Sequence, residues 1–311
     1  MKKLKEKIFQ EFNGSIKDSK KIKFLKNISK SPVYISKATG LVHHQANITS
    51  DKSLEVWSNK IFSNKISYKK LKYTSSNLTM KARHFYCYNF MKKFLGKKIS
   101  SICDFGAGEG NFINEIIKNK LTSKILFTEH SLKNVRKIEN ILKHNKKKYF
   151  LFNGSIEESH NDEDFKNIKV GVLLWTLCNC INPIKVLTSI NKVLTKDGYL
   201  LIGESSRILV PFKKPIYNYF NKNIATNNSH PWHFSFNSIS NLLEISGFRI
   251  IKTNRFNDEN DLVILAKKRN NNSSPKLKID NYKKIEKFLK KWKEISFFLK
   301  KEDKDVSNYT S

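Results

Sequence analysis

The sequence predicts an α/β protein with a largely parallel sheet of seven strands. From about residue 99 to residue 205, apolar runs alternate with stretches whose apolar residues recur every three or four positions. This alternation is typical of parallel strands joined by helices, because each crossover returns the chain to the same edge of the sheet. The last two apolar runs, 248–256 and 261–268, are joined only by the polar loop NDEN, which favours a terminal antiparallel hairpin.

The predicted elements follow one another along the chain. Gly96 and Gly247 stand where helices end, and Pro183 stands in a first helical turn, as these residue types prefer. The predicted helices are 81–96, 111–120, 132–144, 183–194 and 238–247. The predicted strands are 99–105, 124–130, 148–154, 170–177, 198–205, 248–256 and 261–268.

The α/β pattern divides the chain into three regions. Residues 1–80 form a basic, partly helical extension, residues 81–268 form the α/β domain, and residues 269–311 form a linker with a basic amphipathic helix. The apolar stripe of that helix predicts packing on the domain or on a second copy, with an anionic membrane surface as the alternative. The stripe consists of Ile285, Phe288, Leu289, Trp292 and Ile295.

The composition narrows the classes of function. The net charge is +32, with 59 basic residues, but only six of these are arginines and the lysines are scattered. Nucleic-acid binding is therefore an alternative that the sequence does not favour, because specific contacts usually need clustered basic residues with arginine prominent. No apolar run is long enough for a membrane span, and the N-terminus lacks the apolar core of a secretion signal. The four cysteines have no disulfide spacing, so we expect a cytoplasmic protein.

A glycine-rich loop follows the first strand of the domain. Gly106, Gly108 and Gly110 alternate with other residues, and Asp104 comes at the end of the strand. Glycines let a ligand approach the backbone, but a carboxylate here would repel the pyrophosphate of a dinucleotide. The spacing G-x-G-x-G also differs from the dinucleotide pattern. The loop therefore suits a ligand with a cationic amine, and the alternative is a tight strand–helix turn without a ligand.

The stretch DFGAGEG, residues 104–110, resembles the first motif of class I S-adenosylmethionine-dependent methyltransferases. Glu129 ends the next strand, and the stretch NKVLTKDGYLLIGE and the terminal hairpin are also similar to that family. The resemblance covers roughly residues 80–268 and implies a Rossmann-like sheet that binds S-adenosylmethionine. It implies cofactor contacts from Asp104, Gly106, Ala107, Gly108, Gly110 and Glu129, with Glu129 accepting hydrogen bonds from the ribose.

Further cofactor contacts are predicted in the loops after the third and fourth strands. Ile156 is expected on the adenine face and Glu157 near the adenine amino group, although both residues also suit an ordinary loop. Trp175 is expected on the floor of the site or in the core. The next residues, Cys178 and Cys180, lack the context of nucleophilic cysteines, and the motif of nucleobase amine methyltransferases is absent.

The segment SHPWHFSF before the last helix supplies the predicted catalytic residues. Histidine titrates near neutral pH, so we expect His233 to be the general base and His230 to support it. The alternative is that His233 caps the helix and His230 is solvated. The segment resembles the H-x-x-H-F-S stretch of sugar C-methyltransferases and related surface-glycan methyltransferases. The preceding segment, with Arg207 and Tyr219, is expected to form a lid over a phosphorylated substrate.

The stretch VYISKATGLVHH is similar to the end of a zinc module in sugar C-methyltransferases, whose pattern is C-x-x-C-G-L. Ser36 and Thr39 stand at the two cysteine positions, so we expect a degenerate remnant without metal. Taken together, the sequence predicts S-adenosylmethionine-dependent methyl transfer to a small molecule, such as a nucleotide sugar or other glycan precursor. The alternatives are an RNA methyltransferase and a non-catalytic partner protein with the same fold.

Overall fold

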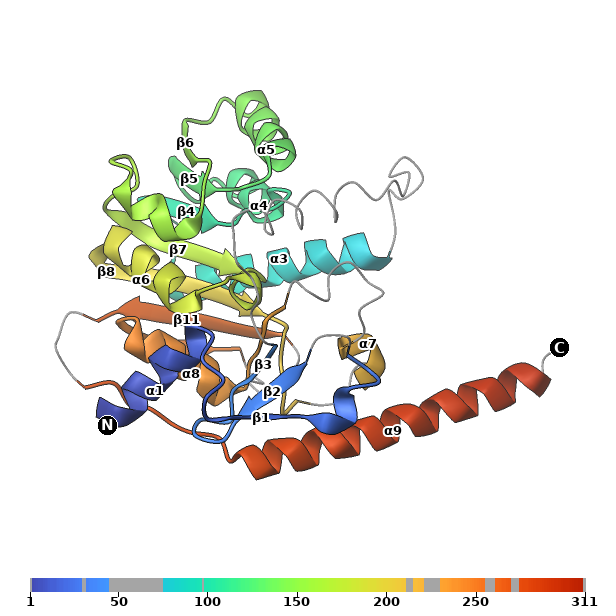
Figure 1. Cartoon of the computed structure of the whole chain (residues 1–311). Helices are drawn as coiled ribbons and strands as arrows, with labels where there is room; N and C mark the ends of the chain where they lie inside the picture. The colour runs from blue at the N-terminus through green and yellow to red at the C-terminus, as the bar shows by residue number, and fades with distance from the viewer. Residues whose placement is uncertain are drawn as a thin grey trace.

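A seven-stranded sheet with helices on both faces forms the main body of the protein (Figure 1). The structure, a computed structural model, describes residues 2–29, 32–44, 75–96, 98–210, 215–220, 230–254, 261–269 and 274–309. The strand order in the sheet is β10-β11-β8-β7-β4-β5-β6. Its strands are β4 (Ser101–Phe105), β5 (Lys124–Thr128), β6 (Tyr149–Phe152), β7 (Ile168–Leu174), β8 (Leu194–Glu204), β10 (Phe248–Thr253) and β11 (Leu262–Lys268).

The pairing confirms the predicted Rossmann-like sheet with its antiparallel hairpin. Strands β4 to β8 pair in parallel, whereas β11 runs antiparallel to both β8 and β10. Parallel strands end at the same edge, so the loops after β4, β5, β6, β7 and β8 come together there. The predicted cofactor residues occupy these loops.

Successive side chains of the strands face two separate hydrophobic layers. In β4, Ile102 packs with one layer, while Cys103 and Phe105 pack with the other. The first layer contains α3 (Ser75–Leu95), α4 (Asn111–Lys118) and α5 (Leu132–His144), and the second contains α1 (Lys2–Phe12), α6 (Pro183–Val193) and α8 (Phe236–Ile245). Burial on both faces explains why these strands are almost continuously apolar.

A smaller four-stranded sheet joins the N-terminal region to the carboxyl edge of the main sheet. Its order is β1-β2-β3-β9, and all its pairs are antiparallel. The strands are β1 (Ser19–Lys21), β2 (Val33–Ser36), β3 (Val42–His44) and β9 (Trp232–His233). Strand β9 belongs to the segment with the predicted catalytic histidines, residues 230–236, which we call the acceptor segment. The N-terminal residues therefore contact this segment directly, and contacts cross the predicted boundary at residue 80.

The C-terminal helix α9 (Tyr282–Tyr309) packs on this small sheet and on α7 (Ile216–Phe220). Ile285, Leu289 and Trp292 are buried in a third hydrophobic cluster with residues of both elements. The prediction that the apolar stripe packs on the domain is therefore confirmed. The last turns of the helix extend away from the body (Figure 1).

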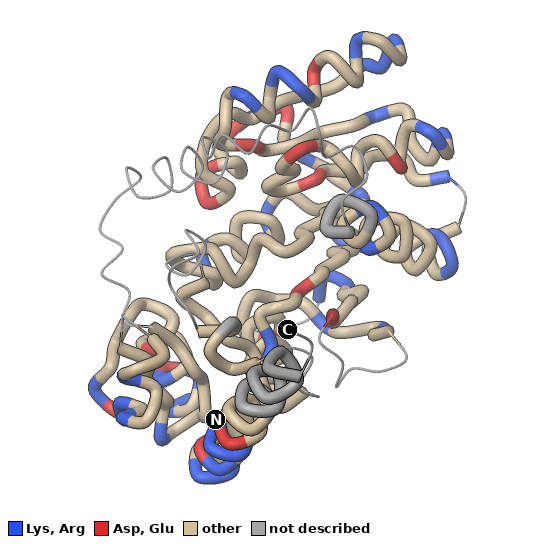
Figure 2. Tube along the Cα trace, turned by 90° about the vertical axis from the view of Figure 1, so that its right-hand side faces the viewer, with Lys and Arg blue, Asp and Glu red and all other residues tan. Residues whose placement is uncertain are grey.

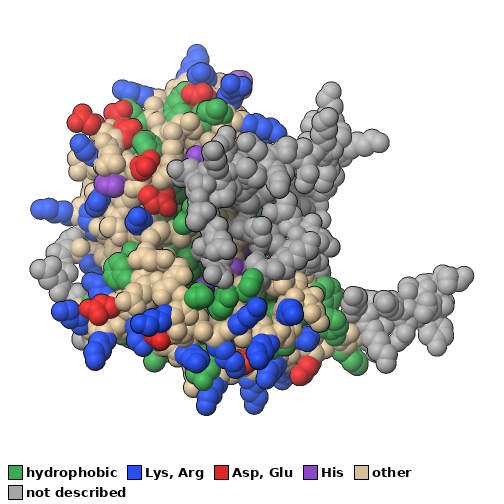
Figure 3. Space-filling model, viewed as in Figure 1, with side chains coloured by type: hydrophobic (Ala, Val, Ile, Leu, Met, Phe, Trp, Pro, Cys, Tyr) green, Lys and Arg blue, Asp and Glu red, His purple; other side chains and the backbone are tan. Residues whose placement is uncertain are grey.

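The surface is basic on several sides rather than along one stripe. Figure 2 shows lysines and arginines on helices throughout the molecule, and Figure 3 shows many of them along its lower edge. Within the residues that the structure describes, no helix is both long and apolar enough to cross a bilayer. The four cysteines are free and buried.

Candidate functional site

The glycine loop connects β4 to α4 and is fastened to the end of β5. The backbone N–H of Gly106 donates to the side-chain oxygen of Thr128 at 2.9 Å and to its carbonyl at 3.0 Å. The N–H of Ala107 donates to the same carbonyl at 3.0 Å, and that of Gly110 donates back to the carbonyl of Ala107. The loop is thereby held as a turn at the carboxyl edge of the sheet.

The three glycines have left-handed backbone conformations, with φ of 70° at Gly106, 55° at Gly108 and 76° at Gly110. A Cβ at Gly106 would lie 2.9 Å from Cγ2 of Thr176, and one at Gly110 would lie 2.8 Å from Cγ1 of Ile138. These two glycines are needed for packing. By contrast, a Cβ at Gly108 would meet no atom within 4 Å, so open space lies before this residue. A ligand can therefore approach the backbone there.

Two buried carboxyl groups lie beside the loop. Asp104 is 3 % exposed and Glu129 is 9 % exposed. Burial, with a smaller effect from the charge of Glu129, raises the pKa of Asp104 to about 8. Burial also raises the pKa of Glu129, partly offset by the hydrogen bonds it accepts. A cationic group placed between the two would favour their charged forms.

Glu129 also organises the loop. One carboxylate oxygen accepts the N–H of Gly108 at 2.7 Å and the other accepts the N–H of Ser131 at 2.8 Å. The side chain of Asn134 and the backbone N–H of His130 also hydrogen-bond to this carboxylate. The backbone carbonyl of Glu129 accepts from Nδ2 of Asn153 at 2.7 Å, which holds the loop after β6 close to it.

The loop after β6 contains the two predicted adenine contacts. Ile156 starts the short helix η3 (Ile156–Asn161). Its side chain packs against the hydrophobic layer that contains α1, α6 and α8, and part of it stays exposed. The carboxylate of Glu157 accepts a hydrogen bond from the hydroxyl of Ser155 at 2.9 Å. Their position in this loop agrees with the predicted roles, which remain predictions.

Trp175 follows β7 in a left-handed conformation with φ of 53°. Such a conformation is strained for a bulky residue and is often found at functional sites. Its N–H donates to the carbonyl of Gly203 at 2.7 Å, and its buried Nε1 hydrogen-bonds to no other described residue. The ring lies 5.0 Å from that of His84 and 5.7 Å from the guanidinium of Arg83, both on α3.

Sequence reasoning did not single out His84 or Arg83. Burial lowers the pKa of His84, whose Nδ1 lies 2.7 Å from the carbonyl of Met80. Arg83 forms an ion pair with Asp261 at 3.1 Å. Both residues look like ordinary polar positions of an amphipathic helix, and only the contact with Trp175 distinguishes them.

The acceptor segment lies over the carboxyl edge of the main sheet. Nε1 of Trp232 donates to the carbonyl of Cys180 after β7, and the N–H of Phe234 donates to the carbonyl of Ser206 after β8. Nδ1 of His230 lies 2.6 Å from Oδ1 of Asn179 and 3.2 Å from Sγ of Cys178. His230 is therefore held by the loop after β7, and the alternative of a merely solvated ring is wrong.

His233 lies deeper, where its ring contacts those of His44 in β3 and of Tyr219 and Phe220 in α7. It is 3 % exposed, and its Nδ1 lies 3.0 Å from the hydroxyl of Tyr219 and 3.2 Å from that of Ser206. The ring of His44 lies 5.2 Å away. The alternative that His233 caps α8 is wrong, because Ser235 is the N-cap and accepts the N–H of Ser238 at 3.0 Å.

The two residues expected in a lid after β8, Arg207 and Tyr219, are buried, which differs from the lid that the sequence suggested. Arg207 is 1 % exposed and Tyr219 is 8 % exposed, so both belong to the interior. Glu204, which sequence reasoning did not select, is fully buried at the end of β8. It accepts the N–H groups of Cys178, Ser205 and Ser206 at 3.1, 2.8 and 2.7 Å. Glu204 therefore joins the loops after β7 and β8.

Cys178 stays a structural residue in this arrangement. Burial, together with the charge of Glu204, raises the pKa of its thiol well above the ordinary range. A neutral thiol is a poor nucleophile, which agrees with the predicted space-filling role.

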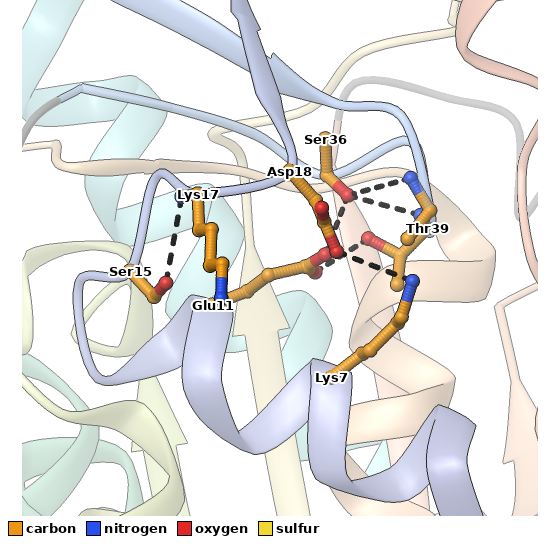
Figure 4. A network of polar contacts seen from close by, with 8 residues as sticks. Lys7, Glu11, Ser15, Lys17, Asp18, Ser36 and Thr39 are labelled. Carbon is orange, nitrogen blue, oxygen red and sulfur yellow. Dashed lines mark hydrogen bonds and ion pairs between the residues drawn. The ribbon is translucent and has the colours of Figure 1, made fainter.

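The zinc-module positions hold a carboxylate network (Figure 4). The hydroxyls of Ser36 and Thr39 donate to the two carboxylate oxygens of Glu11 at 2.5 and 2.6 Å. The hydroxyl oxygen of Ser36 also accepts the backbone N–H groups of Ala38 and Thr39. Within the described residues no group of three or more histidines, cysteines and acids is arranged to hold a metal. Glu11 therefore ties α1 to this turn.

Glu11→Ala is expected to lower the free energy of unfolding by about 2 kcal/mol or more, because it leaves two buried hydroxyls without acceptors. Urea denaturation measures this change. The matched control is Glu6→Ala on the same helix, where the exposed side chain predicts a change within about 0.5 kcal/mol. Equal midpoints for the two variants would contradict a stabilising role for Glu11.

The cofactor edge fits S-adenosylmethionine. The open space at Gly108 lets the cofactor come close to the backbone of the loop. The carboxyl groups of Asp104 and Glu129 suit the cationic amine and the ribose hydroxyls of the cofactor, and the buried Nε1 of Trp175 is an available donor. The family described as a methyltransferase domain matches residues 79–253. Because this is more than half of the chain, the protein belongs to the methyltransferase-domain family, whose cofactor is S-adenosylmethionine.

Solved structures share this fold at low sequence identity. A candidate O-methyltransferase from Nostoc punctiforme is 15% identical with a TM-score of 0.50, and the match covers 71% of this chain and 64% of that one. A candidate methyltransferase from Bacillus halodurans is 14% identical with a TM-score of 0.46, covering 59% of this chain and 98% of that one. The candidate methyltransferase in a complex with the Haloferax volcanii Trm112 activator is 10% identical with a TM-score of 0.48, covering 62% and 94%. No curated protein matches the sequence.

Proposed function

We propose that the protein transfers the methyl group of S-adenosylmethionine to a small anionic molecule, of the class of nucleotide sugars or other glycan precursors. The observation that carries this proposal is the pairing of β9 with β3, in which His233 lies opposite Val42 and Trp232 opposite His43. Through this pairing the N-terminal sheet covers part of the carboxyl edge of the main sheet. An enclosed edge suits a small acceptor better than a polymer.

The net charge of +32 favours an anionic acceptor, because an excess of positive charge attracts anions to the protein. The resemblance of the acceptor segment to sugar C-methyltransferases supports the same substrate class. RNA remains the second candidate because of the net charge of +32, although the basic residues that the structure describes are spread over several sides of the molecule (Figure 2).

The acceptor segment supplies the general base in this proposal. His230 and His233 both stand at the carboxyl edge, and methyl transfer to a protonated acceptor needs a group that takes up its proton. The sequence favours His233 as this base. The geometry favours His230, because it is partly exposed and held beside the loop of Trp175, whereas His233 is 3 % exposed among aromatic rings.

Transfer of a labelled methyl group tests the substrate class. The protein would be incubated with S-adenosylmethionine labelled in its methyl group and, separately, with a panel of nucleotide sugars and with total RNA. We expect label in a nucleotide sugar and none with Asp104→Asn. Label in RNA, lost steeply as salt rises, would favour the RNA methyltransferase instead. Cofactor binding with no transfer to either class would favour a partner protein.

A further inference from the structure

One side chain, Asn179, connects the cofactor side of the site with the acceptor segment. It ends the short helix η4 (Leu177–Asn179), which follows β7. Its Nδ2 donates to the backbone carbonyl of Trp175 at 3.2 Å, and its Oδ1 lies 2.6 Å from Nδ1 of His230. The same amide thus contacts a strained residue of the cofactor edge and a histidine 51 positions further along the chain.

These two contacts fix the orientation of the amide. The carbonyl oxygen of Trp175 can only accept, so the NH₂ group of Asn179 must face it. The amide oxygen then faces His230 and can itself only accept. The ring nitrogen Nδ1 must therefore carry the proton of this hydrogen bond.

The protonation of Nδ1 determines the chemistry of the other ring nitrogen. In a neutral imidazole only one nitrogen carries a proton, so Nε2 of His230 holds the lone pair. The thiol of Cys178 lies 3.2 Å from Nδ1 and donates to Oδ1 of Asn179 at 3.7 Å, so it does not need the lone pair of Nδ1 as its acceptor. The ring is thus held as a proton acceptor at Nε2.

We propose that Asn179 is the positioning residue of the methyl transfer, and that it fixes His230 with Nε2 as the nitrogen that receives the acceptor's proton. This inference rests on the proposed function, because it assigns the base of that reaction. When the acceptor's nucleophilic atom takes the methyl group from the sulfonium, its bond to hydrogen breaks and the proton moves to Nε2. S-Adenosylhomocysteine and an imidazolium remain, so charge and atoms balance.

The assignment also narrows the class of acceptor. Hydroxyl groups and weakly acidic C–H groups need a base during methylation, because their protonated forms are poor nucleophiles. Neutral amines carry an available lone pair and need such help less. The arrangement of Asn179 and His230 therefore favours methylation of oxygen or carbon in the acceptor.

Asn179 couples this base to the cofactor edge as well. The peptide of Trp175 is fixed at its N–H by Gly203 and at its carbonyl by Asn179. Removing the amide would release both the carbonyl of the strained residue and the ring of His230. We therefore expect substitutions at Asn179 to change mainly which nitrogen of His230 carries the proton. The affinity for the cofactor should change by less than about tenfold.

Nuclear magnetic resonance of protein with ¹⁵N-labelled histidines tests the assignment without an acceptor. His230→Gln identifies the resonances of His230 among the eight histidines. In the wild type we expect a protonated Nδ1 and an unprotonated Nε2 at high pH. In Asn179→Ala we expect a mixture of both tautomers, and in Asn179→Asp a titration shifted upward by about one pH unit or more, since a carboxylate favours the imidazolium.

His160 is the matched internal control, because its tautomer is fixed by other groups: Nδ1 lies 2.9 Å from the carbonyl of Glu157, and Nε2 lies 3.1 Å from Nζ of Lys192. Its tautomer should not change in either variant. A wild-type His230 with the proton on Nε2, or a spectrum of His230 unaffected by Asn179→Ala, would overturn the inference. Titration with S-adenosylmethionine is a separate measurement: its failure would contradict the proposed function, whereas normal binding with a wrong tautomer would contradict only this assignment.

Discussion

Asp104→Asn is expected to weaken the binding of S-adenosylmethionine by at least ~100-fold, because we expect the ionised carboxylate of Asp104 to face the cationic amine of the cofactor. Asp104 is the next-to-last residue of β4, two positions before the first glycine of the loop, and it is 3 % exposed. An amide of the same shape keeps the packing but cannot supply the negative charge. Calorimetric titration with the cofactor measures the loss.

The same variant should be more stable than the wild type at alkaline pH. Burial raises the pKa of Asp104 to about 8 from a model-peptide value of 3.8, so the folded protein binds this proton more tightly than the unfolded chain. The contribution of Asp104 to stability is therefore fully present at acidic pH and decreases as the pH rises towards 8. The amide does not titrate, so its advantage over the wild type should grow by roughly 2 kcal/mol or more between pH 4 and pH 9.

Asp164→Asn is the control for both effects, because Asp164 is exposed and lies outside the cofactor edge. It should leave cofactor affinity and the pH dependence of the melting temperature unchanged. A parallel stability profile for wild type and Asp104→Asn would contradict the raised pKa. Equal cofactor affinities would contradict the role of Asp104 as the partner of the amine.

Trp292→Ala is expected to lower the free energy of unfolding by about 3–5 kcal/mol, the usual cost of removing a buried tryptophan. Trp292 is 3 % exposed, and its ring lies 4.9 Å from that of Tyr219 and 5.9 Å from that of Phe288. It therefore holds α9 against α7 and the residues near His233. Urea denaturation followed by circular dichroism measures the change.

The matched control on the same helix is Phe298→Ala, whose side chain is 63 % exposed. Exposed truncations usually change stability by no more than about 0.5 kcal/mol. If Trp292→Ala were as stable as this control, α9 would not pack on the domain, and its apolar stripe would need another partner.

The fold could be predicted from the sequence largely because its main sheet is buried on both faces. Long apolar strands such as 168–174 and amphipathic helices such as 132–144 repeat one pattern, and the terminal hairpin closes it. No comparable pattern in the sequence indicates the small four-stranded sheet. The strand β9 has two residues, and β1 and β3 have three each, so their pairing depends on contacts between distant segments.

Some residues of the candidate site could likewise be predicted from the sequence, whereas others could be found only from the structure. Asp104, the glycines and Glu129 form a local motif with fixed spacing, so the sequence alone indicates a cofactor. Other residues can be recognised only from their contacts with distant parts of the chain, and these are Asn179, Glu204 and Glu11. For example, the hydroxyls of Ser36 and Thr39 donate to the carboxylate of Glu11 (Figure 4). A single sequence does not encode such pairs as a pattern, because neither partner is unusual by itself.

Calorimetric titration of the wild-type protein with S-adenosylmethionine tests the cofactor site most directly. The heat of binding would be measured at pH 7 in two buffers of different ionisation enthalpy, which reports the number of protons released. We expect binding in the micromolar range with net release of a proton, because Asp104 has a pKa of about 8 and the bound amine favours its ionised form. Absence of binding at millimolar cofactor would contradict the assignment of this edge as the S-adenosylmethionine site.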